Sequence, residues 1–485
     1  MSTLVTTVLL LAYLGLLAWL GIAGMKKTTS LESFAVGNRD MNPVLVGVAM
    51  ASSIASTATF VINPGFVYTD GLSAFLHYGV AAQAGVVVGL IAVSKGFRRF
   101  GDEIGAVTIP DWVRQRYGSD ALGLFFAIIN LLSIAFIVLI LFGCAILLTQ
   151  LTGLSHVPAL ITVVVVVFGY VLLGGTYAHA YTNAAQAFLM MAVALALFAS
   201  GWEHISDGEF LTRLRAIEPS YGAVANTDSV LYGDLFAVFV SGFVVTFALM
   251  LQPHVLTKVL YLRSDKDLRT FLLTTFGVGA LFTLCLFVGF YARLDGIPLP
   301  EGGQDHIVTA YVSMAFGSGM LAEALTSAVF VALLAAGMST LDGILVAVSA
   351  MVTHDLYLRG SRRDASPQKA LAASRWAVII IGLIAFALAI DPPALIGLFA
   401  QKGVYGLAAA SFVPLVFGVL RRGALPVTAV AIASAFALGL HFSLHLSGVL
   451  PNPAVSASWA ILASTSLGLV LLYLSGRRAG RRAGR

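Results

Sequence analysis

A stretch rich in hydroxyl side chains interrupts an apolar run near the start of the chain: Ala51-Ser-Ser-Ile-Ala-Ser-Thr-Ala-Thr-Phe60, followed by Asn63-Pro64-Gly65. Five hydroxyl side chains fall within eight residues of it. Ser, Thr and Gly weaken a helix, and Pro64 lacks a backbone donor. We therefore predict a discontinuous helix whose freed carbonyl oxygens can hold a cation. The alternative is a continuous helix that uses these small residues to pack closely against a neighbour.

The rest of the chain has the composition of a membrane protein. Of its 485 residues, 59% are hydrophobic and only 11% are charged, whereas soluble domains are about 45–50% apolar and about 25% charged. The mean hydropathy is +0.94. These values exclude a disordered chain and a soluble enzyme. The net charge of +5 would suit a nucleic-acid-binding protein, but the placement of the basic residues argues against one.

Thirteen segments are long and apolar enough to cross a bilayer, since a membrane helix needs about 20 mostly apolar residues. They are residues 3–24, 43–69, 74–94, 120–152, 157–174, 180–201, 233–252, 270–291, 324–352, 370–390, 393–419, 423–447 and 456–475. No basic residue precedes the first segment, and Lys26 and Lys27 follow it. We therefore expect a retained helix rather than a signal peptide.

The basic residues lie almost entirely on one side of this predicted topology. If the N-terminus is outside, 24 of the 28 Lys and Arg residues are cytoplasmic, Lys258 among them, and Lys402 lies within a span. The three on the outer side are Arg213, Arg215 and Arg293. The positive-inside rule predicts this distribution, so we expect a multi-pass protein of the plasma membrane with a cytoplasmic C-terminus. The basic tail 476–485 would face lipid headgroups rather than nucleic acid.

Two loops carry predicted helices. Thr108-Ile-Pro-Asp111 has the residue types of a helix start, with Thr at the N-cap, Pro in the first turn and Asp at the third position. In the loop 202–232, apolar residues at helical spacing between Phe210 and Ile217 predict a short surface helix. Neither loop is long enough to carry an enzyme, and the chain shows no arrangement of nucleophile and base. The nine histidines show no ligand spacing, so we expect no metal site other than one for sodium.

Three polar side chains within spans stand out. Asp342 lies about mid-span, where an ionisable group costs about 2.5–3.5 kcal/mol on insertion scales and marks a functional site by default. Ser339 and Thr340 lie nearly one turn before it, so hydroxyl and carboxylate oxygens can converge, and hard oxygen ligands suit sodium. Asn183 can join two helices or line a site. Lys402 lies a third to halfway into its span, and we expect it to bind a ligand or to pair with Asp342.

Five motifs, in order along the chain, resemble those of the sodium:solute symporter family. This family includes bacterial proline, sialic acid and galactose transporters and the animal sodium–glucose cotransporters. The resemblance runs from about residue 5 to residue 475. The motifs are Ser30–Arg39, Thr108–Tyr117, Gly174-Gly with Thr182–Gln186, Gln252-Pro-His254, and Ala336–Thr340.

The resemblance implies an all-α polytopic membrane protein with a LeuT-like core of five plus five helices, related as an inverted repeat. Spans two and seven would be the broken helices, with solute and ions at the midplane. The implied parts of this single transport domain, residues 1–485, are an extra helix 3–24, repeats 43–201 and 233–419, peripheral helices 423–475 and the tail 476–485.

The resemblance also implies the coupling ion, sodium, and its ligands. In the family the main site uses two backbone carbonyls of the first core helix and a carbonyl and two hydroxyls of the eighth. The matching residues are Ser52, Ala55, Ala336, Ser339 and Thr340. A second site in some members uses an Asp where this chain has Asn183, so Asp342 and Asn183 form a candidate second cation site. The alternative is the loss of that site, which would leave one ion per solute.

The solute pocket is expected beside the broken helix. Its predicted residues are Ser56, Thr59, Asn63, Tyr78 and Lys402. Sugar-transporting members carry Gln and Glu where this chain has Thr59 and Tyr78, so a sugar is disfavoured. We expect sodium-coupled symport of a small monocarboxylate or an amino or organic acid by alternating access. The alternatives are proton-coupled uptake of the same solutes and a transporter-like channel or sensor.

Overall fold

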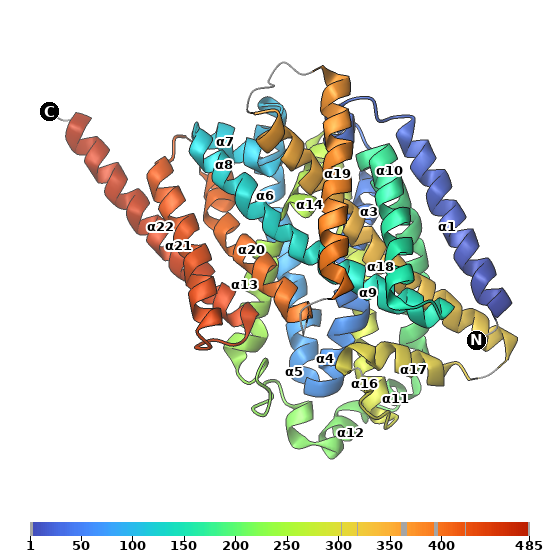
Figure 1. Ribbon diagram of the computed structural model, residues 1–485. Coiled ribbons are helices and arrows are strands. Elements are labelled where there is room, and N and C mark those ends of the chain that lie inside the picture. The colour runs from blue at the N-terminus through green and yellow to red at the C-terminus, as the bar shows by residue number, and fades with distance from the viewer. Residues whose placement is uncertain are drawn as a thin grey trace.

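The computed structural model describes residues 3–301, 303–317, 319–359, 366–391, 396–421 and 423–483. Within these ranges every regular element is a helix (Figure 1). The predicted class, an all-α polytopic membrane protein, is therefore confirmed. Residues 393–395 of one predicted span and residues 484–485 of the basic tail lie outside the described part of the chain.

Ten of the helical segments in these ranges are long and apolar enough to cross a membrane unaided. Their main helices are α1 (Thr3–Met25), α6 (Ala82–Glu103), α9 (Ser133–Thr152), α10 (His156–Ser200), α15 (Asp265–Phe282), α18 (Met320–Met351), α19 (Pro367–Ile390), α20 (Ile396–Leu420), α21 (Val427–Leu446) and α22 (Pro453–Ala483). Short elements extend four of these segments, namely α5 (Leu72–Phe75) with η3 (Leu76–Ala81), α8 (Asp120–Ile129), α16 (Phe287–Leu294) and η10 (Val352–Tyr357).

Two further spans are bent pairs, and they are the second and seventh spans, as predicted. The first joins α3 (Pro43–Ile54) to η2 (Ala58–Ile62) and α4 (Asn63–Asp70) with a bend of 54°. Its break lies at residues 55–57, and Pro64 lies beyond the break, where η2 runs directly into α4. The second joins η6 (Phe236–Val240) and α13 (Ser241–Leu249) to α14 (Pro253–Leu256) and η7 (Thr257–Tyr261) with a bend of 65°.

The predicted count of thirteen spans depends on α10. This helix replaces the predicted pair 157–174 and 180–201, and its 45 residues would be about 68 Å long if straight, more than twice the roughly 30 Å hydrocarbon core. Gly175 breaks its regular geometry with φ 48° and ψ −134°. A Cβ at Gly175 would lie 2.6 Å from the ring of Phe34, so the kink needs glycine. Counting α10 as two crossings gives thirteen.

The central helix of the bundle is α18, whose most apolar 18-residue window is completely buried. It packs against α10 and α9, and α10 also packs against α3 and α1. Helices α20, α21 and α22 pack together at one edge, and α1 lies at the opposite edge (Figure 1). A helix that touches only protein can carry polar groups at membrane depth, and α18 carries Ser339, Thr340 and Asp342.

Both predicted loop helices are present. The first, α7 (Ile109–Tyr117), begins after Thr108, whose side chain accepts a hydrogen bond from the Asp111 N–H at 3.2 Å. The second is α12 (Phe210–Ile217), which buries Leu214.

The predicted position of one basic residue, Lys258, was wrong. Lys258 was expected in a cytoplasmic segment, but it lies in η7, within the second bent span, and is only 1% exposed. The polar motif Gln252-Pro-His254 made the predicted span end at residue 252. In the structure this motif is the bend itself, and the span continues to Tyr261.

Candidate ion and solute site

The end of α3 and the middle of α18 bring a group of oxygen atoms together. The Ser339 Oγ lies 3.0 Å from the Ser52 carbonyl oxygen, and the Thr340 Oγ1 lies 2.9 Å from the Ser53 carbonyl oxygen. The two hydroxyl oxygens also lie 2.9 Å and 3.4 Å from the Ala336 carbonyl oxygen. The last carbonyls of a helix have no intrahelical partner, and α3 ends at Ile54. The break therefore frees the Ser52 and Ser53 carbonyls for other contacts.

These five oxygens belong to residues that are almost completely buried. All are neutral, hard ligands of the kind that alkali and alkaline-earth cations prefer. A cation among them would replace the hydroxyl-to-carbonyl hydrogen bonds with direct oxygen contacts. The arrangement can therefore hold a small cation with little rearrangement of the backbone.

Four of the five predicted sodium ligands meet in this group, namely Ser52, Ala336, Ser339 and Thr340. The fifth, Ala55, is the C-cap of α3, and its N–H binds the Ala51 carbonyl. Neither hydroxyl of the group lies within hydrogen-bond distance of the Ala55 carbonyl oxygen. The Ser53 carbonyl also belongs to the group, and sequence reasoning missed it although Ser53 lies in the same hydroxyl-rich stretch.

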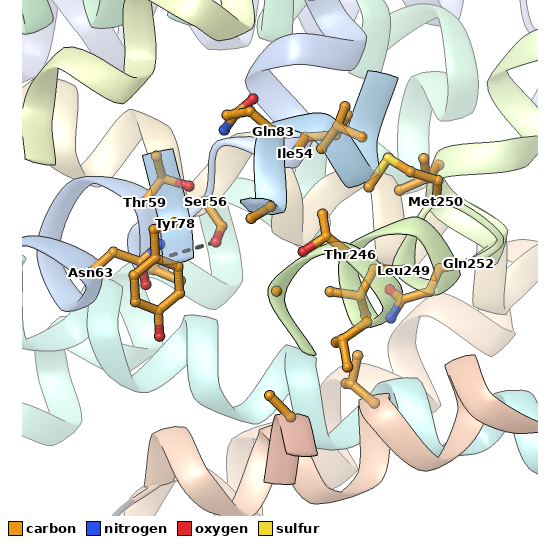
Figure 2. A pocket seen from close by; sticks show the side chains of 18 of the residues that line it. Ile54, Ser56, Thr59, Asn63, Tyr78, Gln83, Thr246, Leu249, Met250 and Gln252 are labelled. Atoms are coloured by element: carbon orange, nitrogen blue, oxygen red, sulfur yellow. Dashed lines mark hydrogen bonds between the residues drawn. The ribbon is translucent and has the colours of Figure 1, made fainter. Parts of the chain in front are cut away.

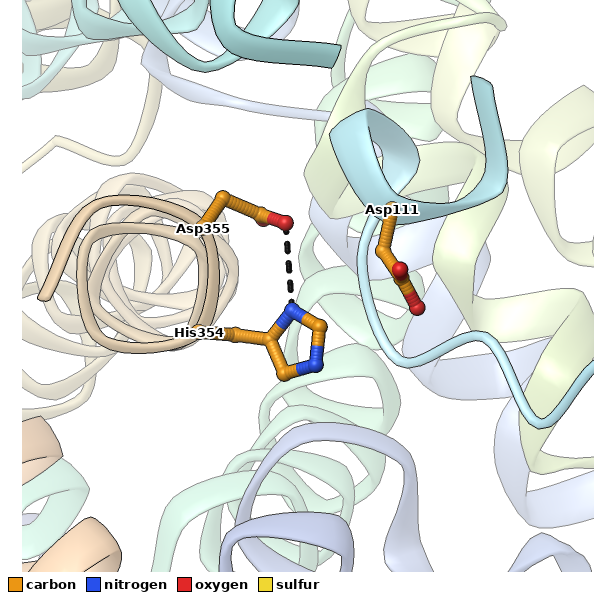
Figure 3. A group of neighbouring side chains, drawn as sticks. All are labelled: Asp111, His354 and Asp355. Atoms are coloured by element: carbon orange, nitrogen blue, oxygen red, sulfur yellow. Dashed lines mark hydrogen bonds and ion pairs between the residues drawn. The ribbon is translucent and has the colours of Figure 1, made fainter. Parts of the chain in front are cut away.

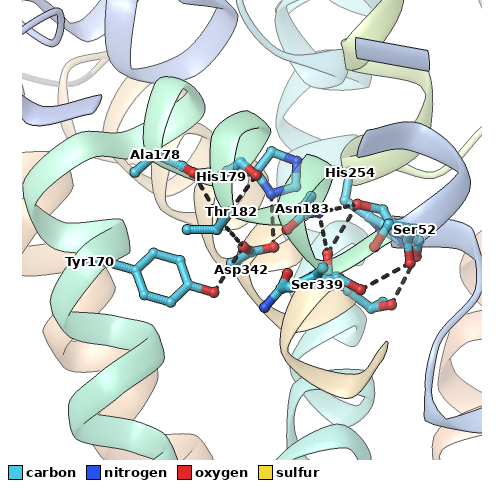
Figure 4. Close-up of polar contacts among 12 residues, drawn as sticks. Ser52, Tyr170, Ala178, His179, Thr182, Asn183, His254, Ser339 and Asp342 are labelled. Atoms are coloured by element: carbon cyan, nitrogen blue, oxygen red, sulfur yellow. Dashed lines mark hydrogen bonds and ion pairs between the residues drawn. The ribbon is translucent and has the colours of Figure 1, made fainter. Parts of the chain in front are cut away.

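Asp342 lies beside this group with no exposed surface. Its carboxylate accepts hydrogen bonds from the Tyr170 hydroxyl at 2.9 Å and the Thr182 hydroxyl at 3.2 Å, and binds His179 Nδ1 at 2.7 Å (Figure 4). Lys402 is not among its partners, so the expected pair of Asp342 with Lys402 is not formed. Sequence reasoning missed Tyr170 and His179.

Asn183 and Asp342, the candidate second cation site, do not bind each other. The Asn183 Nδ2 donates to Ser53 Oγ at 2.9 Å and to the Ser339 carbonyl at 2.7 Å. Asn183 thus braces the oxygen group from α10 (Figure 4). Its side-chain oxygen has no hydrogen-bond partner among the described residues.

Lys258 completes the polar core. Its Nζ donates to the Ser53 Oγ at 3.0 Å and to the His254 carbonyl at 2.7 Å. The Ser53 side chain therefore contacts both an ammonium group and the amide of Asn183, while its backbone carbonyl contacts Thr340.

A cavity of about 190 Å³ opens beside the break in α3 (Figure 2). Four predicted solute-binding residues line it, namely Ser56, Thr59, Asn63 and Tyr78. The Tyr78 hydroxyl hydrogen-bonds to the Tyr232 hydroxyl at 2.8 Å. Polar wall residues that sequence reasoning missed are Gln83, Thr246 and Gln252.

The cavity wall carries no Asp, Glu, Lys or Arg side chain among the described residues. Lys402 was expected there, but it does not line the cavity, although Val404 and Tyr405 of the same helix do. The Lys402 carbonyl oxygen binds His441 Nε2 at 3.1 Å, which ties this part of α20 to α21. Lys402 lies two residues before Val404 on α20. Its side chain faces away from the cavity wall, because successive helix residues face different directions.

A smaller cavity of about 60 Å³ shares Ser56, Ala58 and Phe136 with the larger one. It reaches Asp305 and His306 in η9 (Gln304–His306), the short helical turn that leads directly into α17 (Ile307–Ala315). Burial raises the pKa of the Asp305 carboxyl, and the neighbouring His306 partly opposes this.

Asp111, His354 and Asp355 form a separate cluster at the base of α7, with potential ligand atoms within 4.8 Å of one another (Figure 3). Each of the three side chains already has a protein partner. Asp355 accepts from the Thr108 hydroxyl at 2.6 Å and contacts His354 Nδ1 at 3.1 Å. Asp111 binds Arg114 and Gln115. The cluster therefore ties the start of α7 to η10.

Comparisons with known proteins all identify this chain as similar to solute transporters. The profile of the sodium:solute symporter family matches residues 34–425. The high-affinity proline transporter PutP of Bacillus subtilis (strain 168) is 25% identical over 382 residues, which cover 76% of this chain and 77% of PutP. The uncharacterized symporter YwcA of the same organism is 23% identical over 423 residues, 84% of this chain and 79% of YwcA.

Solved structures show the same fold. A Na⁺-coupled sialic acid symporter in a substrate-bound, outward-open state superposes with a TM-score of 0.81 at 16% identity, and the match covers 97% of each chain. A nucleobase-cation-symport-1 family transporter in a closed conformation superposes with a TM-score of 0.57 at 13% identity, over 93% of this chain and 95% of that one.

Proposed function

Because the chain belongs to the sodium:solute symporter family, we propose that it moves a small monocarboxylate or an amino or organic acid across the plasma membrane together with sodium. Transport proceeds by alternating access, with residues 43–201 and 233–419 as the two inverted repeats. The N-terminus lies outside and the C-terminus in the cytoplasm. The solute, sodium and the surrounding lipid are its partners.

This proposal rests on the position of Ser53, which belongs to both the oxygen group and the cavity wall. Its backbone carbonyl belongs to the oxygen group on α3 and α18, and the residue also lines the solute cavity. An ion bound to the group would pull on the end of α3, which forms one wall of the cavity. Binding of either species would then favour the arrangement that binds the other, which is the coupling that a symporter needs.

The main sodium site consists of the carbonyls of Ser52, Ser53 and Ala336 and the hydroxyls of Ser339 and Thr340. The carbonyl of Ala55, one residue past the end of α3, is a further ligand if the break rotates when sodium enters. The ion would sit where two separately moving helices meet, so its presence would hold α3 against α18.

The cavity limits the solute to a small one with at most one net charge. About 190 Å³ is equivalent to roughly six water molecules at about 30 Å³ each. The side-chain amide N–H groups of Asn63, Gln83 and Gln252 can donate to a carboxylate, but no charged residue of the described wall neutralises it. The sodium ion beside Ser53 supplies that charge, and this dependence links solute affinity to sodium.

A thermal-stability screen of the purified protein tests the solute assignment. Candidate monocarboxylates, amino acids and sugars are added in sodium buffer and in potassium buffer. We expect a monocarboxylate or amino acid to raise the unfolding temperature in sodium only, because a ligand that binds the folded state stabilises it. Stabilisation by a sugar, or equal stabilisation in both buffers, would contradict the proposed solute class or its coupling to sodium.

A further inference from the structure

Asp342 places a carboxylate in the apolar centre of the bundle, with no exposed surface. Its hydroxyl partners, Tyr170 and Thr182, occupy lone pairs but bring no charge. A buried carboxylate is strongly unfavourable unless a positive charge lies nearby. In this family of sodium-coupled proteins, that charge could be a bound ion or a side chain.

Lys258 is the positively charged side chain that lies near Asp342. It is 1% exposed. Among the described residues the direct ion pair of Asp342 is with His179, so Lys258 would attract the Asp342 carboxylate through space rather than by contact. A Cβ placed on Gly343, next to Asp342, would lie 3.4 Å from Lys258 Nζ and 3.5 Å from His179 Nε2. The ammonium and the imidazole therefore flank the same point of α18.

His179 is hydrogen-bonded to Asp342 but not to Lys258. Its Nδ1 binds the Asp342 carboxylate at 2.7 Å, and its Nε2 has no partner among the described residues. Gly343 leaves the space that both groups occupy, because any side chain there would approach His179 Cε1 to 3.0 Å.

The same ammonium reaches the proposed sodium site. Lys258 Nζ donates to Ser53 Oγ at 3.0 Å, and the Ser53 carbonyl contacts Thr340. A second sodium ion close to Asp342 would meet this fixed positive charge in a region of low dielectric, where like charges repel strongly.

We propose that Lys258 is a covalently attached cation that takes the place of a second sodium ion in the transport core. It neutralises Asp342, so the protein binds one sodium ion, at the main site of α3 and α18. The inference rests on the sodium-coupled function proposed above and assigns its ion stoichiometry. In this account the Lys258 ammonium group takes the place of the second ion, so Asp342 and Asn183 are not ligands of a second sodium ion.

Equilibrium binding of radioactive sodium to the purified full-length protein tests this inference without knowledge of the solute. We expect one sodium per wild-type protein. Lys258→Met removes the positive charge and leaves Asp342 without a compensating cation. We therefore expect the number of bound sodium ions per protein to rise toward two and the binding curve to become cooperative. Lys258→Met combined with Asp342→Asn should return the count to one. The matched control, Lys266→Met, changes an exposed lysine nearby and should bind as the wild type does.

The outcomes separate the two proposals. A wild-type protein that binds two sodium ions, or a Lys258→Met variant that still binds one ion without cooperativity, would overturn the role of Lys258. A wild-type protein that binds no sodium would overturn the proposed function instead. If Lys258→Met does not fold, recovery of folding and of one-ion binding in the double variant supports the inference. If that variant also fails to fold, the wild-type count decides.

Discussion

Ser53→Ala tests whether one residue serves both the ion group and the solute cavity. The change removes a side-chain oxygen that accepts from Lys258 Nζ at 3.0 Å and from Asn183 Nδ2 at 2.9 Å. The backbone carbonyl that contacts Thr340 stays in place. The variant therefore removes the support of the ion group without removing a ligand.

The size of the effect follows from the lost hydrogen bonds. A buried hydrogen bond to a charged group is worth about 1.5–3 kcal/mol, and Lys258 keeps only its bond to His254. At 1.4 kcal/mol for each factor of ten, sodium and solute should each bind roughly 10- to 150-fold more weakly if the whole loss falls on binding.

The assay is uptake of the identified solute by proteoliposomes over a range of sodium concentrations. Ser349→Ala is the matched control, because Ser349 lies on α18 and its hydroxyl binds only the Val346 carbonyl of its own helix. We expect Ser53→Ala, and not the control, to raise the half-saturating concentrations of both sodium and solute. A rise for sodium alone would separate the cavity from the ion group, and no rise for either would refute the reasoning.

Three further changes test the fold and the cavity wall. Gly175→Ala puts a side chain at φ 48° and within 2.6 Å of Phe34, so we expect a loss of more than about 1 kcal/mol, seen as a lower unfolding temperature; an unchanged temperature would show that the kink relaxes. Thr108→Ala removes the cap of α7 and the 2.6 Å bond to Asp355, for a loss of about 1–3 kcal/mol in the same assay, whereas Thr108→Ser should retain most of the stability. Lys402→Met should leave the half-saturating solute concentration nearly unchanged, because Lys402 does not line the cavity; a tenfold rise would place its side chain on the solute.

Local sequence predicted the parts of the fold that local chemistry controls. The hydroxyl-rich stretch predicted a broken helix, and the structure places the break at residues 55–57. Thr108-Ile-Pro-Asp111 predicted α7 with its cap. Both depend on backbone donors and acceptors within a few residues, so their signal is contained in the sequence around them.

The charge network could not be predicted in this way. Lys258 follows a polar motif, so hydropathy placed it in a loop, and only the fold shows that it lies buried against Ser53 and His254. The partners of Asp342 lie far away in the chain, with Tyr170 at a separation of 172 residues. A pattern on one helix does not reveal which residues of another helix face it, and for this reason the sequence left open a pair of Lys402 with Asp342 that the structure does not form.

The most direct test of sodium symport at the α3–α18 group is solute accumulation in proteoliposomes under an imposed sodium gradient. We predict that the wild-type protein accumulates solute only with sodium higher outside, and that a sodium ionophore abolishes accumulation. Ser339→Ala and Thr340→Val should each require more sodium for the same uptake, because each removes one of the five oxygens. Accumulation driven equally well by a proton gradient in sodium-free buffer, or wild-type sodium dependence in both variants, would contradict the account.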